Sequence, residues 1–141
     1  MPKRTDHASL LREHGLKATP RRVYLLSLLE KAERPLGTHE LKALWKQGDT
    51  DVVTLYRALE ALVSAGLVRR VNLQHGHMDY ELALPGEHHH HVVCTGCGAI
   101  EHIHIPAESV LEKQALASSA KFSSLSEHAL EFFGTCKTCA A

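Results

Sequence analysis

The chain has 141 residues, of which 44% are hydrophobic and 23% are charged, and its formal net charge is zero. This composition excludes a disordered chain and is typical of one ordinary globular domain or two small ones. No apolar run is long enough to span a bilayer and no signal peptide opens the sequence, so we expect a cytoplasmic protein without a membrane partner.

The charges are distributed unevenly along the chain. Residues 1–84 contain 13 Lys and Arg against 10 Asp and Glu, whereas residues 85–141 contain 3 against 6. Most of the histidines and all the cysteines lie in the second part. We therefore predict two domains with different tasks, 1–84 and 85–141, with a hinge at about 84–88, because Pro85-Gly86 is a typical boundary.

The first part begins with helices. Apolar residues at helical spacing predict helices over residues 5–14, 20–31, 39–47 and 52–65. Residues that favour the N-cap position precede three of them: Thr19, Thr38 and Asp51.

After Gly66 the apolar period changes from helical to alternating. Residues 67–71 predict a strand, and residues 78–84 predict a half-buried return strand in which Met78 and Tyr80 alternate with Asp79. Helices followed by a β-hairpin are the order of a winged helix-turn-helix.

The second part predicts a small α/β domain. We expect strands at 88–94, 99–105 and 125–133, with a helix from Pro106 to about residue 120. The fold class is therefore mixed α/β (α+β), with a winged helix first and a small α/β domain after it.

The helix at 52–65 is the candidate DNA reader, because recognition helices contact base edges with their N-terminal residues. Its first turns expose Thr54, Tyr56 and Arg57. Three further cations would lie near the DNA backbone or the minor groove: Lys17, Arg21 and Arg22. The alternative is an ordinary charged surface, because an excess of three positive charges is modest for a DNA-binding domain.

Two Cys-x-x-Cys pairs predict a structural zinc site. Cys94 and Cys97 form the first pair, and Cys136 and Cys139 form the second. Four thiolates close a tetrahedral site and leave no open position. Redox thiols are the alternative, but the βαβ setting of a thioredoxin-type motif is missing.

Four consecutive histidines, 88–91, precede the first cysteine pair. Side chains alternate between the faces of a strand, so this run can supply two separate metal sites. Mixed histidine and carboxylate ligands suit zinc, iron, manganese or nickel. Further candidates recur at every second position and so share one face of a strand. In the hairpin they are His75, His77, Asp79 and Glu81. In the strand at 99–105 they are His102 and His104, which lie on the face opposite to Glu101.

The sequence resembles the ferric uptake regulator (Fur) superfamily over nearly its whole length. The resemblance rests on motifs that occur in this order: Gly15-Leu16-Lys17-x-Thr19-x-x-Arg22, Thr54-Leu55-Tyr56-Arg57-Ala58-Leu59, Gly66-Leu67-Val68, Tyr80-Glu81-Leu82, the histidine run with Cys94-x-x-Cys97-Gly98, Glu101, His128, Phe133-Gly134 and Cys136-x-x-Cys139. It implies a homodimeric, metal-sensing repressor of metal-uptake genes. Its winged helix would bind an AT-rich palindromic operator in double-stranded DNA, and its second domain would dimerise.

The resemblance also implies roles for individual residues. The structural zinc would be bound by Cys94, Cys97, Cys136 and Cys139. The sensing site would use Glu81, His89, His91 and Glu101, and a further site would use His88, His90, Glu108 and His128. DNA contacts would come from Lys17, Tyr56 and Arg57.

Three departures from the family pattern bear on the sensed metal. Pro35 stands where many members place a sensing histidine before the third helix, and His39 or His77 could replace that ligand. The unbroken histidine run resembles zinc sensors, whereas iron-type members often carry His-His-Asp-His. Zinc sensors often use a cysteine in the sensing site, and this chain has none to spare. We expect Zn²⁺ rather than Fe²⁺ as the regulatory ion by a small margin, with Mn²⁺ as a further option.

Three other functions are alternatives to this prediction. A peroxide-sensing regulator of the same family would oxidise a ligand histidine, and a non-regulatory zinc-binding module would lack sequence-specific DNA binding. A metalloenzyme needs a general base paired with an open metal position, and none stands out, so we predict no enzymatic activity.

Overall fold

A computed structural model describes residues 6–83, 90–105, 108–126 and 128–141, without the side chains at positions 108 and 109. The chain divides into two compact units, Met1–Glu87 and His88–Ala141. The predicted hinge at about 84–88 lies outside the described residues. Among the helices of the described residues, none is both long enough and apolar enough to cross a membrane.

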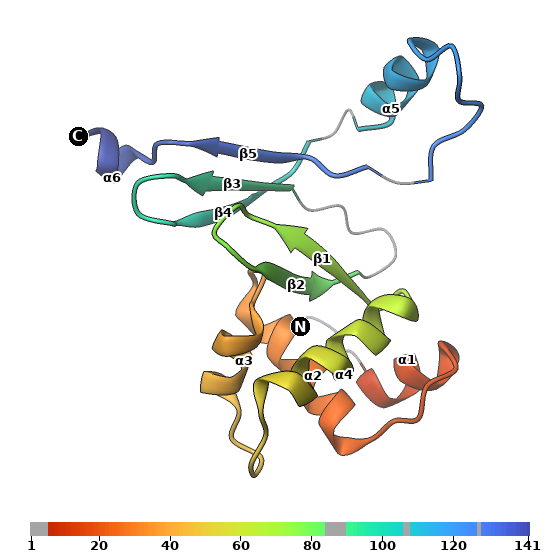
Figure 1. The fold of residues 1–141 in the computed structure, drawn as a ribbon, viewed down its shortest axis with the longest axis vertical. Helices are drawn as coiled ribbons and strands as arrows, with labels where there is room; N and C mark the ends of the chain where they lie inside the picture. Colours follow the sequence, from red (N-terminus) through yellow and green to blue (C-terminus); the bar gives the residue numbers. More distant parts are fainter. Residues whose placement is uncertain (1–5, 84–89, 106–107, 127) are drawn as a thin grey trace. The chain divides into compact units, whose positions relative to one another are not determined.

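Four helices begin the first unit: α1 (His7–Glu13), α2 (Pro20–Ala32), α3 (Thr38–Leu44) and α4 (Val52–Ser64) (Figure 1). The predicted caps of α2 and α4 are confirmed. The Thr19 hydroxyl accepts a hydrogen bond from the Arg22 backbone N–H at 3.3 Å. The Asp51 carboxylate accepts one from the Thr54 backbone N–H at 2.7 Å, which satisfies an N–H group that the helix leaves without a partner.

The predicted bounds of α3 were wrong at both ends. Gly37 is the N-cap instead of Thr38, and its N–H donates to the Glu40 carboxylate at 3.3 Å. Trp45 ends the helix in an extended conformation, and its indole N–H donates to the carbonyl of Gln47 at 3.2 Å. The loop that leads to α4 therefore starts earlier than the apolar spacing indicates.

The hairpin pairs β1 (Val68–Asn72) with β2 (Met78–Leu82) in antiparallel register, from Val68 opposite Leu82 to Asn72 opposite Met78. A short bridge adds Leu36 to the other edge of β2, where Leu36 and Tyr80 exchange two backbone hydrogen bonds of 2.9 and 2.8 Å. This bridge ties the start of α3 to the hairpin.

The core of the first unit is built mainly from leucines on the inner faces of the helices. Burying these side chains is the main favourable contribution to the stability of such a unit. Residues with at most 2% of their surface exposed include Leu25, Leu26, Leu36, Leu41, Leu55, Leu59, Leu62 and Tyr80. The predicted order of helices and then a hairpin is confirmed.

Strand β2 does not follow the predicted alternation at its start. Met78 is 39% exposed, whereas Asp79 is 1% exposed and Glu81 is 6% exposed. Glu81 is paired with Arg69, whose Nε donates to its carboxylate at 2.6 Å. The Leu36 bridge pairs the other edge of β2, and Gly37 beside it lies close to the Asp79 carboxylate. Both faces of the strand carry buried groups.

The second unit contains a three-stranded sheet in the order β4-β3-β5. The central strand β3 (His90–Cys94) runs antiparallel to β4 (Ile100–Ile103) and parallel to β5 (Glu131–Gly134) (Figure 1). Helix α5 (Glu108–Ala117) lies between β4 and β5 in the chain, and α6 (Lys137–Ala140) follows β5.

Two predictions for this unit need correction. The strand predicted over 125–133 begins only at Glu131, because the parallel pairing with β3 covers His91–Cys94 and no more. The short helix α6 was missed, because its start depends on the Cys136 side chain, which accepts a hydrogen bond from the Cys139 N–H.

Candidate metal centres and nucleic-acid interface

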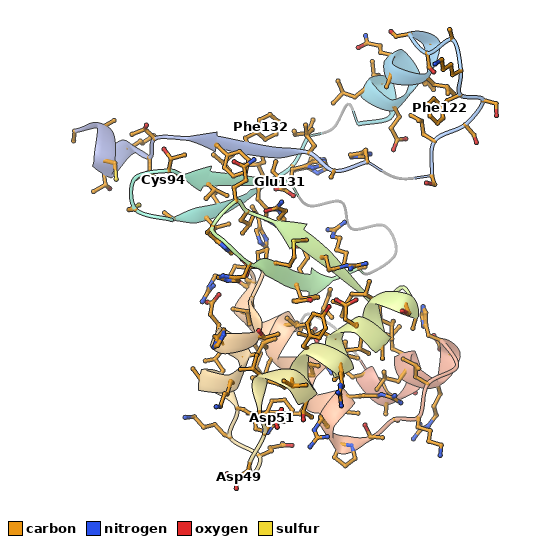
Figure 2. All side chains as sticks on the ribbon, viewed as in Figure 1. Asp49, Asp51, Cys94, Phe122, Glu131 and Phe132 are labelled. Atoms are coloured by element: carbon orange, nitrogen blue, oxygen red, sulfur yellow. The ribbon has the colours of Figure 1, made fainter. Side chains whose placement is uncertain are left out.

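The parallel pairing of β3 and β5 brings the two Cys-x-x-Cys pairs together. Cys94 is the last residue of β3 and lies opposite Gly134, the last residue of β5. The Cys136 N–H then donates to the Cys94 sulfur at 3.4 Å, across 42 positions of sequence. Figure 2 labels Cys94 at this end of the sheet. The sheet register therefore explains why residues so distant in sequence meet.

The four sulfur atoms fit a zinc ion. All of them lie within 4.8 Å of one another, and the sulfurs of Cys97 and Cys136 are 3.7 Å apart. Sulfurs bound to zinc at the corners of a tetrahedron are about 3.8 Å apart, given a Zn–S bond of about 2.3 Å. A Cβ atom at Gly96 would lie 3.2 Å from the Cys139 sulfur, so the turn leaves room for that thiol.

The local electrostatics also favour a cation at this position. Backbone N–H groups, first that of Cys136, hydrogen-bond to the Cys94 sulfur and lower its pKa to about 6. Hydrogen bonds with the neighbouring thiols, first that of Cys136, raise the pKa of Cys139 to about 12. Thiols this close cannot all ionise unless a positive ion offsets their repulsion.

One face of β3 carries His91 as a candidate ligand. His91 lies opposite His102 of β4, with the ring centroids 4.9 Å apart. The His91 Nδ1 is 2.8 Å from the Glu131 carboxylate of β5, which Figure 2 labels at the start of that strand. The carboxylate can accept a hydrogen bond from Nδ1–H, and an imidazole oriented in this way binds a metal through Nε2, the usual arrangement in a metal ligand.

The neighbouring residue, His90, is at the start of a second group. Its ring stacks on that of His128 with centroids 5.5 Å apart, and its Nδ1 is 3.2 Å from the Leu130 carbonyl. The His128 Nδ1 is 2.7 Å from the Glu112 carboxylate. Both imidazoles thus have Nδ1 oriented by an acceptor. The structure brings His90 and His128 together, as the predicted further site requires.

The other predicted ligands either lie outside the described residues or lie away from these histidines. His88, His89 and the Glu108 side chain lie outside the described residues. Glu101 is exposed and lies opposite Val92, on the face of the sheet away from His91, so the register gives the place beside His91 to His102. His39 is exposed and joins no metal-ligating group among the described residues.

Sequence reasoning missed some residues and underrated others. Glu112 and Glu131, which orient histidines, carried no signal in the sequence, since each depends on contacts across at least 16 positions. For His102 the sequence offered one hint: it lies two positions from His104, so both side chains share a face of the strand. In the first unit, His77 is grouped with His75 and Asp79 within the hairpin.

The candidate nucleic-acid interface lies at the start of α4, where Figure 2 labels Asp51. Tyr56 is 50% exposed and Arg57 is also exposed, whereas Leu55 and Leu59 are buried, as the spacing predicted. A hollow of about 560 Å³ separates the start of α4 from the start of α2. Its lining includes most of the predicted DNA-contacting residues: Lys17, Arg21, Arg22, Thr54 and Arg57.

Four cations and two hydroxyls around one hollow make a surface suited to phosphate groups. The Arg22 guanidinium donates to the Lys17 carbonyl at 3.0 Å, which fixes the loop before α2 against that helix. Basic residues from two elements are thereby gathered beside the exposed turn of α4.

The chain matches known proteins over most of its length. The model of the ferric uptake regulator family matches residues 13–133. The ferric uptake regulation protein of Legionella pneumophila is 36% identical over 139 residues, which cover 95% of this chain and 98% of that protein.

Solved structures agree with this match. The ferric uptake regulator of Francisella tularensis with iron superimposes with a TM-score of 0.69 at 32% identity, covering 90% of this chain and 96% of that one. The regulator of Pseudomonas aeruginosa with manganese gives a TM-score of 0.71 at 32% identity, covering 94% and 99%.

Proposed function

The chain belongs to the ferric uptake regulator family, and from this premise we propose that it is a cytoplasmic repressor of metal-uptake genes. Proteins of this family are metal-dependent transcription regulators that bind DNA and form dimers, and they are not enzymes. We propose an AT-rich palindromic operator as its DNA target. The observation that carries the proposal is the joint presence of a Cys₄ cluster, oriented histidines and an exposed basic helix start.

The Cys₄ cluster would hold a structural zinc ion. Four thiolates complete the coordination of zinc and leave no position for a substrate or for exchange with solvent. Such an ion would join the turn after β3 to the turn after β5 and so stabilise the sheet that carries His90 and His91. Structural zinc and the sensing of a second ion are therefore assigned to different residues.

The sensing ion would be bound by His91 together with the predicted ligands Glu81 and His89. We propose His102 as a further ligand in place of Glu101, because His102 lies beside His91 on the same face. Zn²⁺ is the first candidate for this ion, since an imidazole-rich ligand set suits zinc. Fe²⁺ is the second candidate, favoured by the names of the relatives.

The proposed mechanism is a shift between populations of the dimer. The predicted ligands come from both units of the chain, so metal binding would favour the arrangement that fits operator DNA. A metal shifts this balance only as far as it binds the DNA-competent form more tightly than the other form. Loss of the metal would then release the operator.

Metal titration tests the proposal directly. Chelator-treated protein should bind operator DNA weakly, and buffered zinc or anaerobic iron(II) should raise its affinity by about 5- to 150-fold, the usual range of such coupling. Operator binding would be followed by fluorescence anisotropy, with zinc content measured before and after chelation. Equal affinity with and without either added ion, while about one zinc per chain remains bound, would contradict the metal-sensing proposal.

Replacing Arg57 with alanine should weaken operator binding about tenfold, because the exposed guanidinium stands at the turn of α4 that faces DNA. If it contacts phosphate, the slope of log affinity against log salt should also fall by about one. The control is Arg12→Ala, which removes an exposed arginine from α1, outside the hollow. Equal losses in both variants would point to general charge attraction instead of a DNA contact by Arg57.

A further inference from the structure

The β1–β2 hairpin carries three metal-ligating side chains that the proposed function does not use: His75, His77 and Asp79. They occupy the turn and the first residues of β2. In this turn Gln74 and Gly76 have φ of +58° and +95°, a conformation that brings the chain around sharply. As a result His75 and His77 face the same carboxylate.

The three side chains bring their ligand atoms close enough together to bind one ion. Nε2 of His75 is 2.7 Å from Oδ2 of Asp79, and Nε2 of His77 is 3.2 Å from Oδ1. The two imidazole rings are 4.1 Å apart, and the three ligand atoms lie within 4.8 Å of one another. Nitrogen and oxygen ligands of a tetrahedral zinc ion are about 3.3 Å apart, given bonds of about 2 Å.

The Asp79 carboxylate is buried with one of its two oxygens hydrogen-bonded, Oδ2 to His75. It is 1% exposed, and its Oδ1 accepts no hydrogen bond from the described residues. The nearby cations of β1 are engaged elsewhere, because Arg69 pairs with Glu81 and Arg70 with Glu60. A buried carboxylate is costly unless it is paired with a cation or binds a metal.

The chain also keeps space free beside this group. Gly37, which precedes α3, lies against it through the bridge between Leu36 and Tyr80. A Cβ atom on Gly37 would lie 2.9 Å from Nε2 of His77 and 3.0 Å from Oδ1 of Asp79. The φ of Gly37 is −84°, so its backbone conformation does not require glycine. What requires glycine is the close approach of the ligand group.

We propose that His75, His77 and Asp79 form a binding site for a divalent transition-metal ion of the zinc type, within the first unit. Two imidazoles and one carboxylate suit zinc and its neighbours, and water would complete the coordination. Each histidine would bind through Nε2 in its neutral form, and for His75 the bond to the metal would replace its present hydrogen bond to Asp79. This site goes beyond the proposed function, and neither depends on the other.

Occupancy of this site would stabilise the hairpin turn. The ligands come from the turn and from β2, and Gly37 places them against the start of α3. An ion that binds the folded unit and not the unfolded chain raises the stability of that unit. The hairpin would then be more rigid with metal than without it.

Zinc binding by the full chain tests the proposal. In equilibrium dialysis, the double variant His75→Ala/His77→Ala should bind one zinc ion fewer per chain than the wild-type protein. The control is His14→Ala, which also removes an exposed imidazole but leaves the hairpin intact. A zinc ion lost in His91→Ala but not in the hairpin variant belongs to the sensing site, so the two proposals fail separately.

A second variant tests the space that Gly37 provides. Gly37→Ala keeps all three ligands, and it should weaken zinc binding at this site by about 10- to 100-fold, as changes next to a metal ligand do. Circular dichroism would establish that the variant is folded, and ring resonances of His75 and His77 would report the binding by NMR. Unchanged zinc stoichiometry in the double variant, or unchanged affinity in a folded Gly37→Ala chain, would overturn the proposal.

Discussion

Replacing Cys97 with serine should abolish the structural zinc site and unfold the second unit. The serine hydroxyl is a poor zinc ligand at neutral pH, and the three remaining thiolates leave the tetrahedron open. Binding of structural zinc contributes about 10–16 kcal/mol to folding in small zinc domains, which matches or exceeds the whole stability of a typical domain, about 5–15 kcal/mol. The variant should therefore lose its zinc, its ordered sheet and its dimer.

The losses of zinc, of folded structure and of the dimer would be measured by zinc analysis, circular dichroism and sedimentation. The first unit should keep its helical signal, because the described residues of its core include no cysteine. Thr95→Ala is the matched control, since it alters the same turn and removes a hydrogen bond to the Gly134 carbonyl but no thiolate. A folded, dimeric Cys97→Ser protein without zinc would contradict the structural role of the cysteines.

Replacing His91 with alanine should leave a folded dimer that retains its structural zinc but no longer responds to the sensing metal. His91 supplies the imidazole that Glu131 orients at 2.8 Å, and its removal takes away a proposed ligand without touching the Cys₄ cluster. Operator affinity in the presence of metal should fall by about 5- to 150-fold, to the level of the chelated wild-type protein. Anisotropy titrations with and without added metal would measure this loss.

Two further variants decide which β4 residue acts with His91. His102→Ala should reproduce the loss, whereas Glu101→Gln should bind operator as the wild-type protein does, because Glu101 lies on the other face of the sheet. His104→Ala, which removes an exposed imidazole just after β4, serves as the control. A metal response that fails in Glu101→Gln and persists in His102→Ala would restore the assignment made from the sequence.

The helical half of the protein was predictable because its signals are local. Capping by Thr19 and Asp51 and the buried face of α4 depend on residues within a few positions of one another. The cysteine pairs were predictable for a similar reason, since their spacing already matches the ligand geometry of zinc. For the two pairs to meet, the fold has only to bring the turn after β3 next to the turn after β5.

The rest depended on contacts between distant segments. The place of His102 beside His91 follows from the register of β3 and β4, and a shift of one residue would have put Glu101 there instead. Asp79 was expected to face solvent because β2 alternates, but it is buried, and Gly37, which follows the bridge at Leu36, lies against its carboxylate. No local pattern in the sequence indicates that bridge. Orienting carboxylates such as Glu131 follow from the same long-range pairing.

The parallel pairing of β3 with β5 has a consequence for how the protein is made. His91 and Glu131 are 40 positions apart, and closing a loop of that length costs about 3 kcal/mol of chain entropy. At about 5–20 residues per second, the ribosome adds those residues in roughly 2–8 s. During that interval β3 and β4 exist without β5, and the first cysteine pair exists without the second. The first unit, whose core comes from earlier residues, can fold in the meantime, whereas the second must await the end of β5 and a zinc ion.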